Sequence, residues 1–232
     1  MSRAMSKIPL VLIPGLLCDS AAWEYQTKHL ADIAIPTVIS FHGENTPEKM
    51  VQAILKQSPH QFALAGHSMG GWLALEVMRH APARAIKLCL LNTTASPDSP
   101  DKLQRRKQMI QTVEHGKFHE LAMQLSDGFI LQQRIKKPLQ EMFFRSGASR
   151  FINDQTAMIQ RSESFSILPT IKIPTLIIHA LQDQLFSLAE HEEMASLIPN
   201  AQLALIEDSG HMSPMEQPQA ITTLMRLWLT YF

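Results

Sequence analysis

The chain has 232 residues, of which 45% are hydrophobic and 18% charged, so it suits one large domain or one domain with an inserted subdomain. This composition argues against a disordered chain. Lysine plus arginine and aspartate plus glutamate each number 21, and the resulting net charge of zero argues against nucleic acid or an anionic membrane as the main partner.

The N-terminal segment MSRAMSKIPLVLIPGLLC places basic residues before an apolar run that ends at Cys18, in loose imitation of an export signal. Prolines and a glycine interrupt the run, and no small-residue cleavage site follows it. We therefore keep export as the alternative and expect a cytoplasmic protein without a membrane-spanning segment. Cys18 and Cys89 match no metal-ligand spacing and are too few for a disulfide framework, so free thiols and no metal are expected.

Short apolar segments alternate with amphipathic segments through residues 1–95. The predicted strands are 8–13, 35–41, 61–66 and 85–92, and the predicted helices between them are 20–32, 46–58 and 69–81. The second helix carries a start signal, a capping hydroxyl at Thr46 followed by Pro47. Consecutive strands lie too far apart for hairpins, so the alternation predicts a parallel sheet with crossover helices.

A helical segment interrupts this alternation. From about residue 101 to 166, apolar residues recur at three- and four-residue intervals, which predicts helices with breaks at Gly116 and Gly128. The remaining predicted elements are strands 173–179 and 201–207 and helices 188–197 and 217–231. The predicted fold is therefore an α/β core of about six strands, residues 1–95 and 170–232, with a helical insertion over 96–169.

Residues 62–77, FALAGHSMGGWLALEV, place Ser68 between two glycines at a strand-to-helix junction. G-x-S-x-G in this context is the nucleophile elbow, in which a sharp turn exposes the serine hydroxyl at the N-terminus of a helix. Gly66 and Gly70 lack the Cβ atoms that would clash in so tight a turn. A Gly-rich turn with a capping serine is the alternative, because the bare pattern also occurs by chance.

A serine hydroxyl needs a base before it becomes a good nucleophile, and ten histidines compete for that role. His211 is the best candidate, since it follows the last predicted strand in EDSGHMSPMEQP and parallel strands bring their carboxyl-end loops together. His179, at the end of a strand, is the rival. His67 adjoins the serine but lies on the strand side of the elbow, so a structural role is predicted for it.

The base in turn needs an acid that fixes its tautomer and stabilises its charged form. Asp183, in IIHALQDQLF, follows the strand 173–179 and is separated from His211 by one predicted helix and one predicted strand. The loops of the two residues should therefore lie side by side. Asp208 is the rival, and its alternative role is to cap a turn in the histidine's own loop.

An oxyanion hole needs two backbone N–H groups that face one point. In a nucleophile elbow one donor is the residue after the serine, here Met69, and the other lies in the loop after the first strand, here PGLLC. Leu16 is the predicted second donor, and Leu17 is the alternative.

Together these segments resemble the α/β-hydrolase superfamily, in its branch of small esterases and lactonases. LVLIPGLLCDSAAW resembles the oxyanion loop, GHSMGG the elbow, IPTLIIHALQDQLF the acid loop and IEDSGHMSPMEQPQAI the histidine loop. The resemblance covers nearly the whole chain and implies that the helical insertion is a lid. The chain departs from the family where Pro14-Gly15 replaces the His-Gly of many relatives, and where HALQDQ lacks their glycine and arginine.

The sequence therefore predicts a cofactor-free serine hydrolase, monomeric or homodimeric, that cleaves a small carboxylic ester or lactone. Apolar residues of the insertion suggest a pocket for an apolar acyl part, with simple packing of the lid as the alternative; they are Met123, Phe129, Met142, Phe143, Phe144, Phe151 and Met158. Carbon–carbon bond hydrolysis, acyl transfer, perhydrolysis and a non-catalytic binding protein stay open, because fold and triad do not fix the reaction.

Overall fold

A parallel sheet of six strands organises residues 7–232, the part of the chain that the computed structural model describes. Its strands are β1 (Ile8–Ile13), β2 (Ala34–Val38), β3 (Phe62–His67), β4 (Ala85–Leu91), β5 (Thr175–Ala180) and β6 (Ala201–Ile206). They pair in the order β2-β1-β3-β4-β5-β6, which confirms the predicted parallel sheet of about six strands. Of the segment weighed as an export signal, Arg3 lies outside the described residues, whereas its apolar part forms β1.

The strand boundaries differ most from the predicted ones at β2. The apolar run predicts a strand to residue 41, but β2 ends at Val38, which pairs with Leu12. The amide of Ile39 still donates to the Leu12 carbonyl, and β1 itself ends one residue later at Ile13. β2 lies at the edge of the sheet and pairs with β1 alone. It therefore has no partner strand beyond the end of β1.

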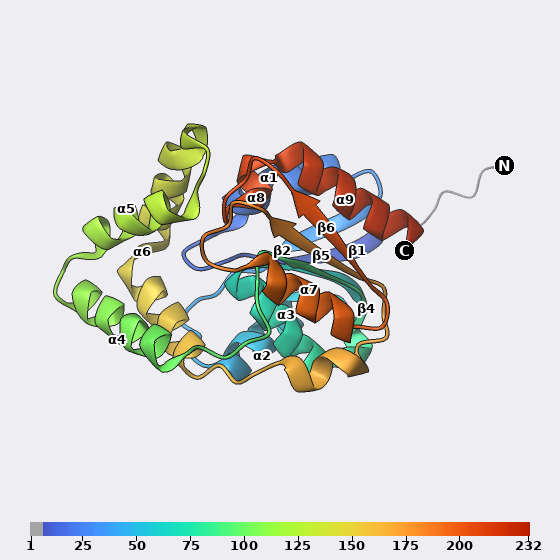
Figure 1. Cartoon of the computed structure of the whole chain (residues 1–232), viewed down its shortest axis with the longest axis horizontal. Coiled ribbons are helices and arrows are strands. Elements are labelled where there is room, and N and C mark those ends of the chain that lie inside the picture. Colours follow the sequence, from blue (N-terminus) through green and yellow to red (C-terminus); the bar gives the residue numbers. More distant parts are fainter. Residues whose placement is uncertain (1–6) are drawn as a thin grey trace.

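Helices cover both faces of the sheet (Figure 1). On one face lie α1 (Glu24–His29) and α9 (Pro218–Tyr231), and on the other α2 (Pro47–Gln57), α3 (Met69–His80) and α7 (Leu188–Leu197). The predicted helix 20–32 is instead a 3₁₀ turn, Ser20–Trp23, followed by the short α1. The Asp19 side chain accepts a hydrogen bond from the Ala21 amide and so fixes where this turn begins.

Three helices between β4 and β5 contact one another beside the sheet, at the left of Figure 1. They are α4 (Pro100–Glu114), α5 (Phe118–Phe129) and α6 (Lys136–Ile159), and we call them the cap. Gly116, with φ +80°, separates α4 from α5, while α5 ends one residue after Gly128. A kink at Gly147, with φ +82°, was not anticipated from the sequence. That residues 96–169 form a separate domain stays a prediction.

The core lies between the sheet and its helices, and three tryptophans, Trp23, Trp72 and Trp228, are fully buried in it. Cys18 and Cys89 are both free and buried. None of the helices in residues 7–232 is long and apolar enough to cross a membrane. The cytoplasmic location and the oligomeric state stay predictions.

Candidate active site

Ser68 occupies the sharp turn between β3 and α3, where the strand ends at His67 and the helix begins at Met69. Its backbone has φ +56° and ψ −119°, outside the regions that L-residues favour. A Cβ on Gly66 would lie 2.1 Å from the Gly70 carbonyl oxygen, and a Cβ on Gly70 would lie 2.2 Å from the Ile13 carbonyl oxygen. Both glycines are therefore required by the close approach of backbone to backbone, as the sequence pattern predicts.

The structure brings Ser68, His211 and Asp183 together in one hydrogen-bonded line. His211 Nε2 lies 2.8 Å from Ser68 Oγ, and His211 Nδ1 lies 2.9 Å from Asp183 Oδ2. Asp183 follows β5 and His211 follows β6, and these neighbouring parallel strands deliver both loops to the same edge of the sheet. The Gln182 amide donates to the Ser209 carbonyl and ties the two loops together.

The Asp183 carboxylate accepts two hydrogen bonds besides that of His211. They come from Asn92 Nδ2 (2.8 Å) and from the Leu185 amide (2.8 Å). Burial alone would raise the pKa of Asp183, but the His211 interaction and these two donors hold that pKa well below its usual range. The carboxylate therefore stays ionised beside His211.

Asn92 is a site residue that the sequence reading missed. It follows β4, has φ +43°, and its side-chain oxygen accepts a hydrogen bond from Ser213 Oγ at 2.8 Å. This bond fixes which end of the amide faces Asp183. The position of Asn92 at the carboxyl end of β4 indicates this edge of the sheet, but its bond to Asp183 follows only from the strand order, in which β4 lies beside β5.

Aromatic rings surround the His211 imidazole, which is 1% exposed. The ring centres of Phe129, Phe186 and His67 lie 5.2, 5.7 and 5.0 Å from that of His211. His67 Nε2 also lies 2.7 Å from the His211 carbonyl oxygen, and burial lowers the pKa of His67 to about 3. A neutral His67 thus donates to the backbone of the histidine loop, in keeping with the structural role predicted for it.

His179 and Asp208, the alternative candidates for the base and the acid, lie outside this hydrogen-bonded line. The His179 ring packs against His191 in a tilted arrangement, with ring centres 4.3 Å apart, and burial lowers the pKa of His179 to about 4. Asp208 is exposed, and its carbonyl accepts hydrogen bonds from Gln132 and Gln217. Among residues 7–232 the ring of His211 is paired with Asp183 rather than with Asp208.

Leu16 and Met69 line the same cavity as Ser68. Among the described residues neither of their N–H groups has an acceptor, whereas the Leu17 N–H faces Asp154 Oδ2 at a long 3.5 Å. Leu17 has φ +59°, and its carbonyl accepts a hydrogen bond from Ser146 Oγ (2.8 Å). These contacts favour Leu16 over Leu17 as the second oxyanion donor.

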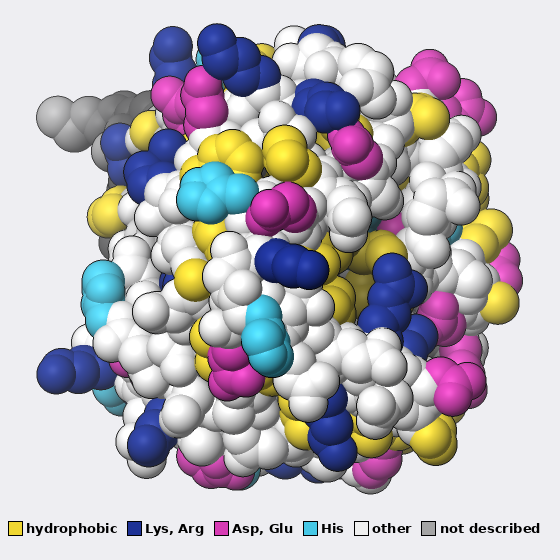
Figure 2. Space-filling model, turned by 90° about the vertical axis from the view of Figure 1, so that its left-hand side faces the viewer, with side chains coloured by type: hydrophobic (Ala, Val, Ile, Leu, Met, Phe, Trp, Pro, Cys, Tyr) yellow, Lys and Arg dark blue, Asp and Glu magenta, His cyan; other side chains and the backbone are white. Residues whose placement is uncertain are grey.

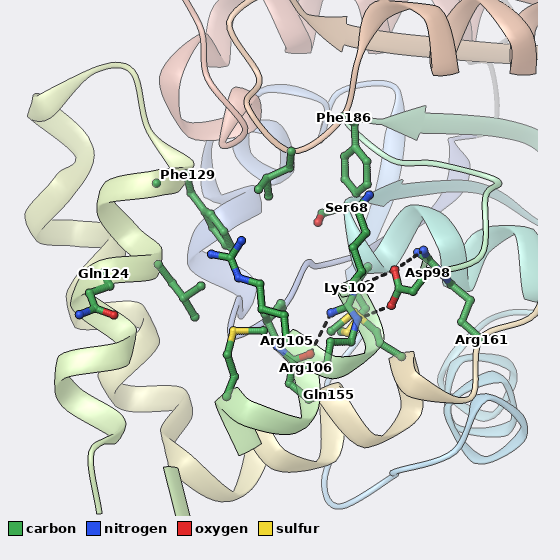
Figure 3. A pocket seen from close by; sticks show the side chains of 17 residues that line it. Ser68, Asp98, Lys102, Arg105, Arg106, Gln124, Phe129, Gln155, Arg161 and Phe186 are labelled. Atoms are coloured by element: carbon green, nitrogen blue, oxygen red, sulfur yellow. Dashed lines mark hydrogen bonds and ion pairs between the residues drawn. The ribbon is translucent and has the colours of Figure 1, made fainter. Parts of the chain in front are cut away.

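A cavity of about 230 Å³ opens beside Ser68, between the sheet and the cap (Figure 3). Its apolar wall consists of Leu16, Met69, Met109, Leu125, Phe129, Met158, Leu185 and Phe186. Of the seven apolar residues considered from the sequence, only Phe129 and Met158 line it. Met142, Phe143 and Phe151 are fully buried in the core, and Met123 is 43% exposed, so the packing alternative holds for the buried three.

In the part of the chain that the structure describes, no group of three or more His, Cys, Asp or Glu side chains is placed to hold a metal ion.

The alpha/beta hydrolase family model matches residues 10–223, so the chain belongs to the alpha/beta hydrolase family. A pimeloyl-[acyl-carrier protein] methyl ester esterase from Aromatoleum aromaticum is 24% identical over 253 residues, which cover 95% of this chain and 98% of that relative. A thermophilic esterase structure from Thermogutta terrifontis is 26% identical, with a TM-score of 0.87 over 96% of this chain and 89% of the esterase.

Another relative is longer than this chain. A biotin biosynthesis bifunctional protein from Cellvibrio japonicus is 23% identical over 238 residues, which cover 96% of this chain. The chain spans 47% of that protein's length, so the match concerns about half of it.

Proposed function

We propose that this chain is a cofactor-free serine hydrolase that cleaves a carboxylic ester or lactone with Ser68, His211 and Asp183. The observation that carries the proposal is the hydrogen-bonded line from Ser68 Oγ through both His211 nitrogens to Asp183, at the side of a cavity. Two of the similar proteins are named as esterases, which supports the same class of reaction.

In the first half of the reaction, Ser68 Oγ attacks the carbonyl carbon and His211 Nε2 takes the hydroxyl proton. The Asp183 carboxylate stabilises the imidazolium that forms and keeps Nδ1 protonated. The tetrahedral oxyanion lies against the N–H groups of Leu16 and Met69, each worth about 3 kcal/mol in the transition state. The carbon–oxygen bond to the alcohol then breaks, and His211 returns its proton to the departing oxygen.

In the second half, a water molecule attacks the acyl-enzyme on Ser68. His211 takes a proton from the water, the second tetrahedral intermediate collapses, and the proton passes to Ser68 Oγ as the acid leaves. His211 is 1% exposed and Ser68 lines the cavity, so the attacking water approaches the acyl-enzyme from the cavity.

The acyl part next to the ester carbonyl is apolar in this proposal. Leu16, Leu125 and Phe129 supply part of the apolar wall beside Ser68, and Met109 and Met158 add flexible side chains that adapt to different chains. Turnover of p-nitrophenyl esters should therefore rise from acetate toward medium-length acyl groups. A steady fall in kcat/KM with chain length would contradict an apolar acyl site.

Ser68→Ala is the direct test of the reaction. A fluorophosphonate probe should add once to the wild type, as read by intact mass, and should not add to Ser68→Ala, because the nucleophile is gone. Ester turnover should be lost while the circular dichroism spectrum is kept. Ser196→Ala, which changes an exposed serine on α7, is the matched control and should label like the wild type. A folded wild type that takes no label would favour a non-catalytic binding protein.

A further inference from the structure

The cavity beside Ser68 has a charged side opposite its apolar wall. Four cationic side chains line it, Lys102, Arg105, Arg106 and Arg161, against one carboxylate, that of Asp98. Three of the four cations come from the first turns of α4. Figure 2 shows a hollow with hydrophobic side chains inside it and lysine or arginine side chains at its rim.

Asp98 neutralises only part of this charge. Arg106 Nε donates to Asp98 Oδ2, and Arg161 Nη2 donates to Asp98 Oδ1 at 2.8 Å. Burial by itself would raise the pKa of Asp98, but the bond from Arg106 and the nearby cations lower it, so the carboxylate is ionised. Arg106 also donates to Gln155 Oε1 at 2.8 Å. One carboxylate between two guanidinium groups leaves a net positive charge held rigidly at the wall.

Lys102 and Arg105 add two further positive charges. Within residues 7–232 neither side chain lies within 4.0 Å of a carboxylate. They stand three residues apart on α4, on the face that also carries Met109, and Figure 3 shows them projecting into the cavity. Lys102 Nζ lies 5.9 Å from the centre of the Phe186 ring, which in turn lies 5.7 Å from the His211 ring. Phe186 therefore lies beside both the Lys102 ammonium and the His211 ring.

A neutral apolar ester does not account for this arrangement. Cations that face a cavity with a low-dielectric wall raise the local concentration of an anionic ligand and hold it by charge-assisted hydrogen bonds. The whole chain has a net charge of zero, so the excess positive charge at this cavity is balanced elsewhere on the chain. A fork-shaped guanidinium beside an ammonium suits a carboxylate, which accepts from both.

We propose that the substrate is an ester whose acyl part ends in a carboxylate, separated from the ester carbonyl by an apolar spacer. Ser68 takes the ester carbonyl, the apolar wall takes the spacer, and Lys102 and Arg105 bind the distal carboxylate. Monoesters of dicarboxylic acids have this chemistry. The inference rests on the proposed hydrolase function for the reaction itself, but the binding preference is measurable without turnover.

The matched pair of probes is the monomethyl ester and the dimethyl ester of one dicarboxylic acid, tried for succinate, adipate and sebacate. The two esters differ in one charge and little in shape. With the wild type at low ionic strength, kcat/KM for the best monoester should exceed that for its diester by about tenfold or more, since a charge-assisted hydrogen bond contributes at least this much. High salt should reduce the ratio.

The variants Lys102→Gln and Arg105→Gln should each lower the monoester-to-diester ratio, and the double variant should bring it close to one. Lys107→Gln removes a charge from an exposed position of the same helix, away from the cavity, and should keep the wild-type ratio. A wild-type ratio of one or below, for all three acids, would overturn the proposal and leave the two cations as a solvated rim.

Binding to Ser68→Ala separates this proposal from the proposed function. Calorimetry should show that Ser68→Ala binds the monoester about tenfold more tightly than the diester. That preference without any turnover by the wild type would support the anion site and refute the hydrolase. Turnover of diesters without a binding preference would support the hydrolase and refute the anion site.

Discussion

Ser68 combines a reactive side chain with a strained backbone. Its positive φ is a conformation that costs about 1–3 kcal/mol for a residue with a Cβ and persists where the surroundings enforce it. The Ser68 amide donates to the Leu91 carbonyl, and Thr93 Oγ1 donates to the Ser68 carbonyl at 2.8 Å. Both partners belong to or follow β4, so the neighbouring strand holds the serine in the turn that presents Oγ to His211.

Gly70→Ala tests how tightly the elbow is packed. The added Cβ would meet the Ile13 carbonyl oxygen at 2.2 Å, and this backbone atom of β1 cannot move without disturbing the sheet. We expect a loss of about 3 kcal/mol or more in the free energy of unfolding, measured by urea denaturation. Gly128→Ala is the control: nothing lies within 4 Å of its added Cβ, and alanine in a helix should stabilise by about 0.5–1 kcal/mol. Equal stabilities would contradict the packing of the elbow.

The site residues differ in how far their roles could be predicted from the sequence. Ser68 stands in a local pattern whose mechanical reason, glycines at a tight turn, is visible in five neighbouring positions. Asn92 has no such pattern, because its bond to Asp183 joins residues 91 positions apart and depends on β4 ending beside β5. The acid's second partner was therefore out of reach until the strand order was known.

The cap helix α6 is bonded to the loop that carries the candidate oxyanion donor. Asp154, fully buried on α6, faces the Leu17 amide, and Ser146 Oγ donates to the Leu17 carbonyl. Arg150 Nε donates to Asp154 Oδ1 at 2.6 Å. Although this bond to Arg150 favours the ionised carboxylate, burial raises the pKa of Asp154 to about 6. Because Leu17 follows Leu16 directly, the position of the Leu16 N–H depends on a helix of the cap.

Asp154→Asn tests this link between the cap and the loop. The amide keeps the size of the side chain but leaves the half-buried Arg150 without its carboxylate, so we expect the free energy of unfolding to fall by about 1–3 kcal/mol. A loosened loop should also lower kcat about tenfold with a smaller change in KM, less than the loss of a whole oxyanion donor.

Glu141→Gln, at an exposed position of the same helix, is the control for Asp154→Asn and should change neither value. An unchanged kcat in folded Asp154→Asn would show that the loop holds its shape without the cap. Steady-state kinetics and urea denaturation on the same preparations give both readouts.

Secondary structure was predictable where side-chain periodicity determines it. The buried strands β3 and β5 are continuous apolar runs, and α2 begins where Thr46 caps it and Pro47 opens it. The kink at Gly147 was not predictable, because the residues on both sides continue in helical conformation and a glycine shows nothing of its φ in the sequence.

At the scale of the whole molecule, the candidate site residues lie together at the carboxyl edge of the sheet. β3, β4, β5 and β6 are consecutive in the sheet, and the chain leaves their carboxyl ends at Ser68, Asn92, the Asp183 loop and the His211 loop. This follows from parallel strands joined by crossover helices and was predictable from the alternation of elements. The charge of the cavity was not, since it depends on how α4 lies against the sheet.

The depressed pKa of Asp183 makes the stability of the whole fold depend on pH. Its carboxylate is favoured in the folded state, so its contribution is fully present above the ordinary pKa of 3.8 and is lost as the pH falls below that value. The difference in the free energy of unfolding between the wild type and Asp183→Asn is compared from about pH 5 downward, the range in which the Asp183 carboxyl of the unfolded chain takes up its proton. It should shrink by about 1 kcal/mol by about pH 3.

Urea denaturation of both proteins at matched pH measures this difference, and the subtraction removes the titration of shared groups that do not interact with Asp183. Asp208→Asn changes an exposed carboxylate in the neighbouring loop, so its difference from the wild type should remain flat over the same range. A difference for Asp183→Asn that grows as the pH falls would mean that burial outweighs the bonds from His211, Asn92 and Leu185. The acid would then be protonated in the folded state and unable to stabilise an imidazolium at His211.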